Sequence, residues 1–203
     1  VAILYVDIAG FTRLSEQILK TPSAVAELVE TWSRDAVEIL WSHGGVFDKM
    51  VGDCIIGLFG PPFYDESEGE RLARAIECAR DIRAMTNLLS ERPQFVEKLK
   101  SEGVAVSTGV NLAPLFVGQF GPNSNFTGFS SGMNNTARLQ GCAGKNEILV
   151  MEDAIKKLPE GAALLDRPPH DPPQDVAAIL VRGHDAVGEQ EGGAARVVGD
   201  DPH

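Results

Sequence analysis

The sequence predicts an α/β fold in which helices pack against a mixed, largely antiparallel sheet. Three observations indicate it: the chain opens with a strand that is apolar on both faces, two short apolar runs meet at a Gly-Asp turn, and longer stretches repeat apolar residues with helical spacing. The 203 residues, 43% of them hydrophobic, are enough to bury a substantial core. We expect a single domain over residues 1–203, with its core in 1–151 and a loop and hairpin in 152–203.

The first elements alternate strand and helix. Residues 1–6 predict a buried strand that ends at Asp7, and residues 13–19 predict a helix that stops near Pro22. The stretch 23–42 keeps an apolar stripe at i, i+3 and i+4, which is typical of a longer helix with one buried face.

A β-hairpin is predicted over Val46–Val51 and Cys54–Phe59. Only Gly52 and Asp53 separate the two runs, and a Gly-X connector is typical of a type II′ turn, because glycine takes the required positive φ easily. The turn places the carboxylate of Asp53 at the tip, with Lys49 on a strand beside it. Gly-Asp is also common in ordinary turns, so the pattern alone leaves a purely structural role open.

The second half of the chain continues in the same way. Helical patterns are expected over 66–89 and 130–140, and a Pro-, Asp- and Gly-rich loop over 158–175. Residues 121–125 also predict a loop. The remaining predicted strands are 104–111 and 115–120, interpreted as a second hairpin, then 147–151, and finally 177–182 and 194–198, interpreted as a closing hairpin.

Composition excludes several classes of partner. The formal net charge is −11 and the sequence pI about 4.8, so we expect no nucleic-acid binding and no direct membrane contact from this segment.

Cys54, Cys78 and Cys142 fit neither a disulfide framework nor a zinc site, which favours a reducing setting. No apolar run reaches the roughly 18 residues of a membrane span. The chain opens inside a strand without Met, so we interpret it as an excerpt and expect a cytoplasmic location, alone or as part of a larger, membrane-anchored protein.

Two carboxylates share a similar position at strand ends. Asp7 follows the first strand and Asp53 lies at the hairpin tip, so neighbouring strands would bring both to one edge of the sheet. Carboxylate oxygens suit Mg²⁺ or Mn²⁺, and metal pairs roughly 3.5–4 Å apart recur in displacement at phosphorus. Gly10-Phe11-Thr12 opens a helix just after Asp7 and offers backbone N–H groups to phosphate oxygens. Spacing alone leaves Asp7 equally open to an ordinary capping role.

A polar pair marks the helix predicted over 130–140. Asn134 and Arg138 are four residues apart and share a face, where a guanidinium beside an amide suits charge developing on a phosphoryl group. A solvated polar face is the commoner explanation of such a pair. Thr127, in a Gly-rich segment, gives a weaker signal by itself.

Four blocks together resemble the class III nucleotidyl cyclase catalytic domain, in the order and spacing of that family. The blocks are VDIAGFTRLSE from Val6, GGVFDKMVGDCIIGLFG from Gly44, GVNLAPLFVGQFG from Gly109 and NNTARLQ from Asn134. The resemblance spans most of residues 1–151. It implies an α+β sandwich with a ferredoxin-like β-α-β-β-α-β core, a mixed, largely antiparallel sheet and flanking helices.

The same resemblance implies an adenylate cyclase, which converts ATP to 3′,5′-cyclic AMP and pyrophosphate. The 3′-hydroxyl would attack the α-phosphate in line, assisted by two Mg²⁺ or Mn²⁺ ions. Asp7 and Asp53 match the metal-holding aspartates, with the Ile8 carbonyl as a further ligand. Asn134 matches the residue that orients the ribose, and Arg138 the one that stabilises charge on the α-phosphate.

Base selection is implied by two further positions. Lys49 matches the lysine that reads adenine N1, and Thr127 falls at the second base-reading position. This Lys/Thr pair resembles bacterial soluble, bicarbonate-responsive adenylate cyclases, whereas guanylate cyclases typically carry Glu and Cys. The family also uses a phosphate-binding lysine in its last hairpin, and Arg182 is the nearest cation here.

Departures from the family pattern affect loops. Ser130-Ser131 stands where the family often has Gly-Asp, and residues 122–125 replace an approach rich in Arg and Lys. In the family each active site lies between two antiparallel protomers, and this chain carries both halves, so we expect a homodimer with two composite sites. A catalytically silent nucleotide-sensing or dimerisation module and a guanylate cyclase stay open as alternatives.

Overall fold

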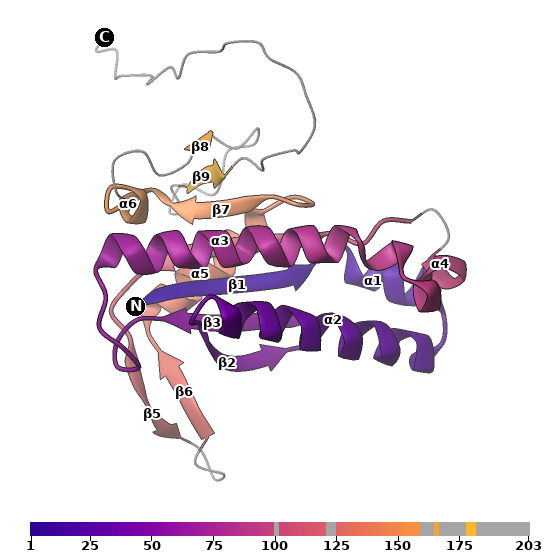
Figure 1. Ribbon diagram of the computed structural model, residues 1–203, viewed down its shortest axis with the longest axis horizontal. Coiled ribbons are helices and arrows are strands. Elements are labelled where there is room, and N and C mark those ends of the chain that lie inside the picture. The colour runs from indigo at the N-terminus through magenta and orange to yellow at the C-terminus, as the bar shows by residue number, and fades with distance from the viewer. Residues whose placement is uncertain (100–101, 121–124, 159–164, 167–177, 182–203) are drawn as a thin grey trace.

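A seven-stranded sheet forms the centre of this computed structural model, which describes residues 1–99, 102–120, 125–158, 165–166 and 178–181 (Figure 1). The strand order is β2-β3-β1-β4-β7-β9-β8. The strands are β1 (Ala2–Ile8), β2 (Val46–Val51), β3 (Cys54–Phe59), β4 (Val106–Leu112), β7 (Ile148–Met151), β8 (Leu165–Asp166) and β9 (Ala178–Val181).

The first four strands of the sheet form the predicted ferredoxin-like core. Strand β1 lies between β3 and β4 and is antiparallel to both, and β2 is antiparallel to β3 at the edge. Strand β7 adds a parallel neighbour to β4, and β9 returns to antiparallel pairing. The sheet is therefore mixed and largely antiparallel, as the sequence predicts.

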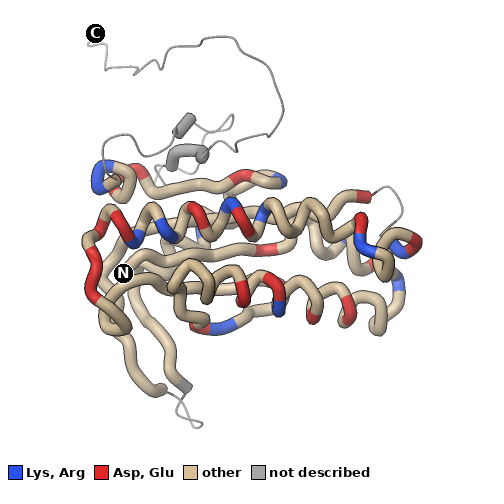
Figure 2. The backbone as a smooth tube through the Cα atoms, viewed as in Figure 1, with Lys and Arg blue, Asp and Glu red and all other residues tan. Residues whose placement is uncertain are grey.

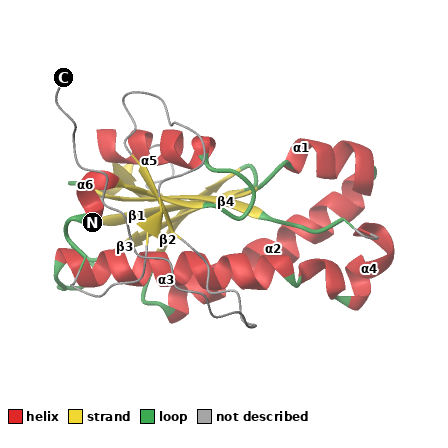
Figure 3. Ribbon diagram, turned by 90° about the horizontal axis from the view of Figure 1, so that it is seen from above, coloured by secondary structure: helices red, strands yellow, loops and turns green. Residues whose placement is uncertain are grey.

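Helices cover both faces of the sheet. Seen from above, α2 (Pro22–Ser42) and α3 (Glu68–Asn87) lie on one side and α5 (Ser131–Cys142) on the other (Figure 3). The larger core lies under α2 and α3, where the indole Nε1 of buried Trp32 donates to Thr86 Oγ1 at 2.9 Å. In the part of the chain that the structure describes, no helix combines the length and apolar character needed to cross a membrane. Shorter helical segments are α1 (Phe11–Arg13), a π-helix (Leu14–Leu19), a 3₁₀-helix (Leu89–Glu91), α4 (Pro93–Leu99) and α6 (Glu152–Ile155).

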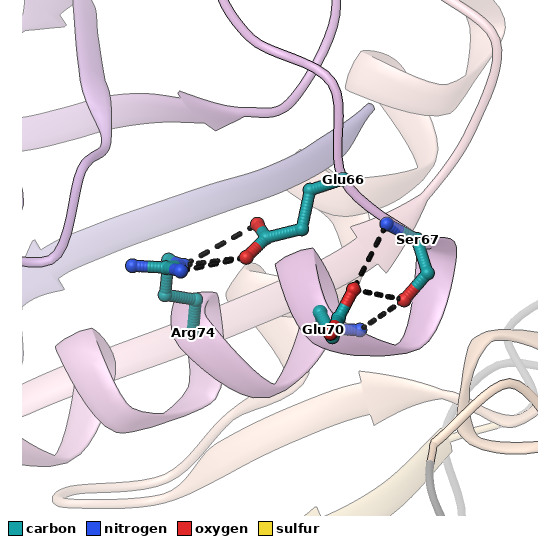
Figure 4. Close-up of polar contacts among 4 residues, drawn as sticks. All are labelled: Glu66, Ser67, Glu70 and Arg74. Atoms are coloured by element: carbon teal, nitrogen blue, oxygen red, sulfur yellow. Dashed lines mark hydrogen bonds and ion pairs between the residues drawn. The ribbon is translucent and has the colours of Figure 1, made fainter.

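Local capping chemistry fixes where the long helices begin. Ser67 and Glu70 form a capping box at α3: the Glu70 N–H donates to Ser67 Oγ at 3.3 Å, and the Ser67 N–H donates to Glu70 Oε2 at 3.1 Å (Figure 4). Arg74 pairs with Glu66 at 2.6 Å one turn further on. At α2, Thr21 accepts from the Ala24 N–H. These contacts satisfy N–H groups that lack partners within a helix.

The second predicted hairpin is wrong. Strand β4 pairs with β1 and β7, whereas β5 (Phe116–Phe120) pairs with β6 (Asn125–Phe129) in a separate two-stranded arm that projects from the sheet (Figure 1). Strand β4 is buried on both faces, so it belongs at the sheet centre. Gly109 lets α5 approach it, because a Cβ there would lie 2.7 Å from the Gln140 backbone nitrogen.

The loop predicted through residue 125 and the closing hairpin predicted near the end of the chain can also be compared with the structure. The loop expected through residue 125 is wrong at its end, because β6 begins there; Asn and Gly residues hide this strand from a propensity argument. The strand expected over 177–182 corresponds to β9, whose described partners are β7 and β8. Its expected partner, 194–198, lies outside the described residues.

Candidate active site

Two carboxylates meet at one end of the central strands. Asp7, near the end of β1, is opposite Cys54 of β3, the first residue after the Gly52-Asp53 turn. Gly52 has φ of 63°, and Asp53 has no positive φ, as the predicted type II′ turn requires. The two carboxyl groups share a hydrogen bond, and Asp53 Oδ2 is buried with no hydrogen-bond partner among the described residues. The predicted convergence of Asp7 and Asp53 is therefore present.

The electrostatics of this pair favour a bound cation. Burial first, and then the charge of Asp53 and the shared hydrogen bond, raise the pKa of Asp7 to about 7. Gln140 Nε2 lies 3.5 Å from Asp7 Oδ2 and, together with the Ile8 backbone, opposes that shift. A divalent ion would give the buried Asp53 oxygen a partner and remove the repulsion. The donor set therefore fits Mg²⁺ or Mn²⁺.

The rest of such a coordination shell would come from outside the acidic side chains. Within the described ranges, no group of three or more His, Cys, Asp or Glu side chains gathers around a common point. Backbone carbonyls such as that of Ile8, water and ligand oxygens would complete the shell, which is the usual pattern for Mg²⁺ beside phosphates.

The segment after Asp7 turns into a helix, as expected. Gly10 has φ of 71°, and its carbonyl accepts from the Leu14 N–H at 3.1 Å. Phe11 is half-buried against the core and Thr12 is exposed. The phosphate contacts expected of these residues stay a prediction.

We expect Mn²⁺ to bind the domain about tenfold more weakly at pH 6 than at pH 8, because binding must displace the proton that Asp7 holds up to about pH 7. The folded domain also keeps this proton over a range where the unfolded chain, with the ordinary value of 3.8, has lost it. Without metal, the free energy of unfolding should therefore decrease as the pH rises from about 4 to about 7. Thermal unfolding with and without Mn²⁺ at several pH values measures both effects.

Substituting Asp7→Asn separates the two effects. Removing one carboxylate should raise the melting temperature of the metal-free domain at pH 8 and abolish its stabilisation by Mn²⁺. Asp65→Asn makes the same chemical change at an exposed position and should behave as wild type. An equal Mn²⁺ response at pH 6 and pH 8 in the wild type would contradict the proposed link to Asp7.

A second cluster joins β2 to the arm. Lys49 Nζ lies 3.3 Å from Asp48 Oδ2 and 5.6 Å from the centre of the Phe129 ring. Thr127 Oγ1 donates to Asp48 Oδ2 at 3.2 Å, and the Gly128 N–H donates to Asp48 Oδ1 at 3.0 Å. The structure therefore brings the two predicted base-reading residues, Lys49 and Thr127, to a single carboxylate.

The third group lies on α5. Asn134 and Arg138 are both exposed, on a helix whose buried residues pack against the sheet. Ser130 caps this helix by accepting from the Met133 N–H at 3.1 Å, so the departure from the family's Gly-Asp keeps a regular helix start. Asn134 and Arg138, four residues apart on this helix, therefore share an exposed face, and their roles toward ribose and phosphate stay a prediction.

Two polar residues near these groups were not predicted. Gln140 links α5 to Asp7 and to Ser107 Oγ, which it contacts at 2.8 Å. Asp48 has a fully buried side chain. A regular strand directs neighbouring residues to opposite faces, and β2 has a register shift between Phe47 and Lys49, at Asp48. No sequence signal marks this irregularity. Arg182 lies outside the described residues.

The structure defines an α+β domain with two carboxylates paired at one end of its central strands. The chain belongs to the adenylate and guanylate cyclase catalytic domain family, whose model matches residues 1–169. It is therefore a cyclase catalytic domain of that family. No curated protein sequence matches the chain.

Solved structures of such domains share the fold. The adenylyl cyclase CyaB from P. aeruginosa superposes with a TM-score of 0.78 at 21% identity, over 92% of this chain and 96% of that one. The guanylyl cyclase Cya2 gives 0.70 at 19% identity, over 91% and 93%. A dimeric guanylyl cyclase domain of the RhoGC fusion protein from the aquatic fungus Blastocladiella emersonii gives 0.73 at 17%, over 90% and 95%. At these identities the likeness concerns the fold alone, and the neighbours include both specificities.

Proposed function

We propose that residues 1–203 form an adenylate cyclase catalytic domain, which converts ATP to 3′,5′-cyclic AMP and pyrophosphate. The observation that carries the proposal is the pair Asp7 and Asp53, whose carboxyl groups face each other and leave a buried oxygen of Asp53 without a partner among the described residues. Two such carboxylates suit cations that accompany a nucleoside triphosphate. They also explain how a protein of net charge −11 accepts a polyanion.

Each site residue of this chain has a proposed role in binding the metal ions, the phosphates or the ribose, or in stabilising the transition state. Bound Mg²⁺ or Mn²⁺ would supply neutralisation of the triphosphate and activation of the 3′-hydroxyl. Asp7 and Asp53 would hold the ions, with the Ile8 carbonyl beside them, and the Gly10-Phe11-Thr12 backbone would bind phosphate oxygens. Asn134 would orient the ribose, and Arg138 would stabilise charge on the α-phosphate in the transition state. Arg182 is proposed as a further phosphate contact.

The active form is proposed to be a homodimer with composite sites. Asn134 and Arg138 are exposed, and the β5–β6 arm presents Phe116, Phe129 and Phe126 with exposed fractions of 69%, 52% and 44%. Figure 2 shows no acidic or basic residue along the described part of this arm. An uncharged, aromatic projection is typical of a surface that a protein partner covers, and a second copy would also complete each site.

We propose ATP as the substrate because of Lys49 and Thr127, which both contact the carboxylate of Asp48. A lysine donates to adenine N1, which accepts, whereas N1 of guanine carries a hydrogen and cannot accept from it. Guanylate cyclase activity is the second candidate, because structural neighbours of that specificity share the fold.

Cyclic nucleotide formation by the purified domain tests the proposal. We expect cyclic AMP from ATP in Mg²⁺ or Mn²⁺, little cyclic GMP from GTP, and a specific activity that decreases on dilution as dimers dissociate. Predominant cyclic GMP would favour the second candidate. No product at any protein concentration would favour a catalytically silent module, and a constant specific activity down to nanomolar protein would argue against dissociable composite sites.

A further inference from the structure

Asp48 is a charged side chain that the proposed chemistry does not use. Its carboxylate is fully buried at the edge of the sheet, where burial of a charge is costly unless the group is fully hydrogen-bonded. Its partners come from two elements: Lys49 on its own strand, and Thr127 and Gly128 on the arm. Such a group needs an explanation beyond strand formation, since a valine would fill a strand edge more favourably.

The contacts fix the direction of one hydrogen bond. A carboxylate only accepts, so the Thr127 hydroxyl must donate its single hydrogen to Asp48 Oδ2. The oxygen of Thr127 then has only lone pairs left for any other partner. A threonine hydroxyl ordinarily rotates and serves as donor or acceptor, but beside Asp48 it is held as an acceptor.

An acceptor at this position distinguishes the two purines. Adenine carries an amino group at carbon 6, which donates, whereas guanine carries a carbonyl oxygen there, which accepts. We propose that Asp48 is a specificity-determining positioning residue: it holds the Thr127 hydroxyl as an acceptor, so that the second base-reading position takes the adenine amino group and rejects the guanine oxygen. This inference rests on the proposed function and assigns the discrimination to the Asp48–Thr127 pair, not to threonine alone.

The geometry also predicts what an amide would do at position 48. The Gly128 N–H donates to Asp48 Oδ1, so in Asp48→Asn the amide oxygen must keep that place. The amide NH₂ group then takes the place of Oδ2, beside both Thr127 and Lys49. It donates to Thr127, which releases the threonine hydrogen toward the base. An isosteric substitution therefore reverses the polarity of the Thr127 hydroxyl. The preference for ATP over a purine that keeps the N1 acceptor separates this effect from any change at Lys49.

The experiment compares three substrates with the wild-type domain and Asp48→Asn. These are ATP, GTP and purine riboside triphosphate, which lacks the amino group but keeps the N1 acceptor for Lys49. We expect Asp48→Asn to reduce the kcat/KM preference for ATP over each of the other two by about 10- to 100-fold. A merely structural role would lower all three kcat/KM values together and leave the ratios unchanged, which would overturn the inference.

Variants at Thr127 provide matched controls. Thr127→Val should lower the same ratios, and adding Asp48→Asn to it should lower them no further, because the two residues act through one hydroxyl. Thr127→Asn can donate its NH₂ group to Asp48 and present its carbonyl oxygen to the base, so it should retain the preference for ATP. If circular dichroism shows that Asp48→Asn is unfolded, a Thr127→Asn variant that discriminates as poorly as Thr127→Val overturns the inference.

Failure of the proposed function would look different. A wild-type domain that forms no cyclic AMP overturns the cyclase assignment itself. A wild-type domain that prefers ATP, with unchanged ratios in the folded Asp48→Asn variant, overturns only the role of Asp48.

Discussion

Asp53→Asn is expected to reduce cyclic AMP formation by about a thousandfold or more while leaving the domain folded. The substitution removes one of the two carboxylates that face each other at the hairpin tip, and with it half of the charge that would hold the metal ions. The fold should persist, because asparagine is isosteric and the turn depends on the positive φ of Gly52. Initial rates in saturating Mn²⁺, together with thermal unfolding, measure both parts of the expectation.

The same substitution at Asp65 is the matched control, since that aspartate is exposed. Asp65→Asn should retain wild-type rates. Residual activity above about a tenth of wild type in folded Asp53→Asn would contradict the two-carboxylate assignment, because losing a metal ligand should remove several kcal/mol of transition-state stabilisation. Isothermal titration of Mn²⁺ into each aspartate variant would then show which substitutions weaken binding of the ion.

Local chemistry explains which parts of the fold the sequence predicts well. The hairpin of β2 and β3 has the predicted bounds, because a two-residue turn fixes the register and Gly52 fixes the turn. Helices α2 and α3 match the predicted stripes to within about two residues, since capping residues set their first turns.

Long-range pairing explains what the sequence does not predict. Strand β4 is followed closely by β5, and adjacent strands usually pair, but β4 is already occupied on both edges by β1 and β7. Strand β5 therefore needs another partner and finds it in β6, whose sequence carries weak strand signals. The contacts that decide this arrangement come from residues far apart in the chain.

The candidate site divides in the same way. Asp7 and Asp53 meet because β1 pairs with β3, with Asp7 opposite Cys54. The sequence places each carboxylate at a strand end or turn, whereas the pairing of the two strands comes from the structure. The contact of Thr127 with Asp48 depends on the register shift in β2 and on the arm, and neither has a signal in the sequence. The sequence therefore did not identify the buried carboxylate of Asp48, although the family resemblance had assigned a role to its neighbour Lys49.

Mixing two inactive variants is expected to restore activity if each site takes its halves from different protomers. Arg138→Ala should lose about a hundredfold or more by itself, since a guanidinium on the transferring phosphoryl group carries much of the rate enhancement. In a heterodimer of Asp53→Asn with Arg138→Ala, one site receives both substitutions and the other receives neither. Random exchange of equal amounts should therefore give about a quarter of the wild-type number of intact sites.

A second mixture distinguishes composite sites from general stabilisation of one variant by the other. Asp7→Asn and Asp53→Asn alter the same half, so every site in their heterodimer lacks one metal-holding carboxylate, and this mixture should stay inactive. If neither mixture gains activity although subunits exchange, both halves of each active site come from one protomer. The exposure of Asn134 and Arg138 then needs another explanation. If only the first mixture gains activity, the aspartates of one copy work with the arginine of the other, because no other pairing of the two chains contains an intact site.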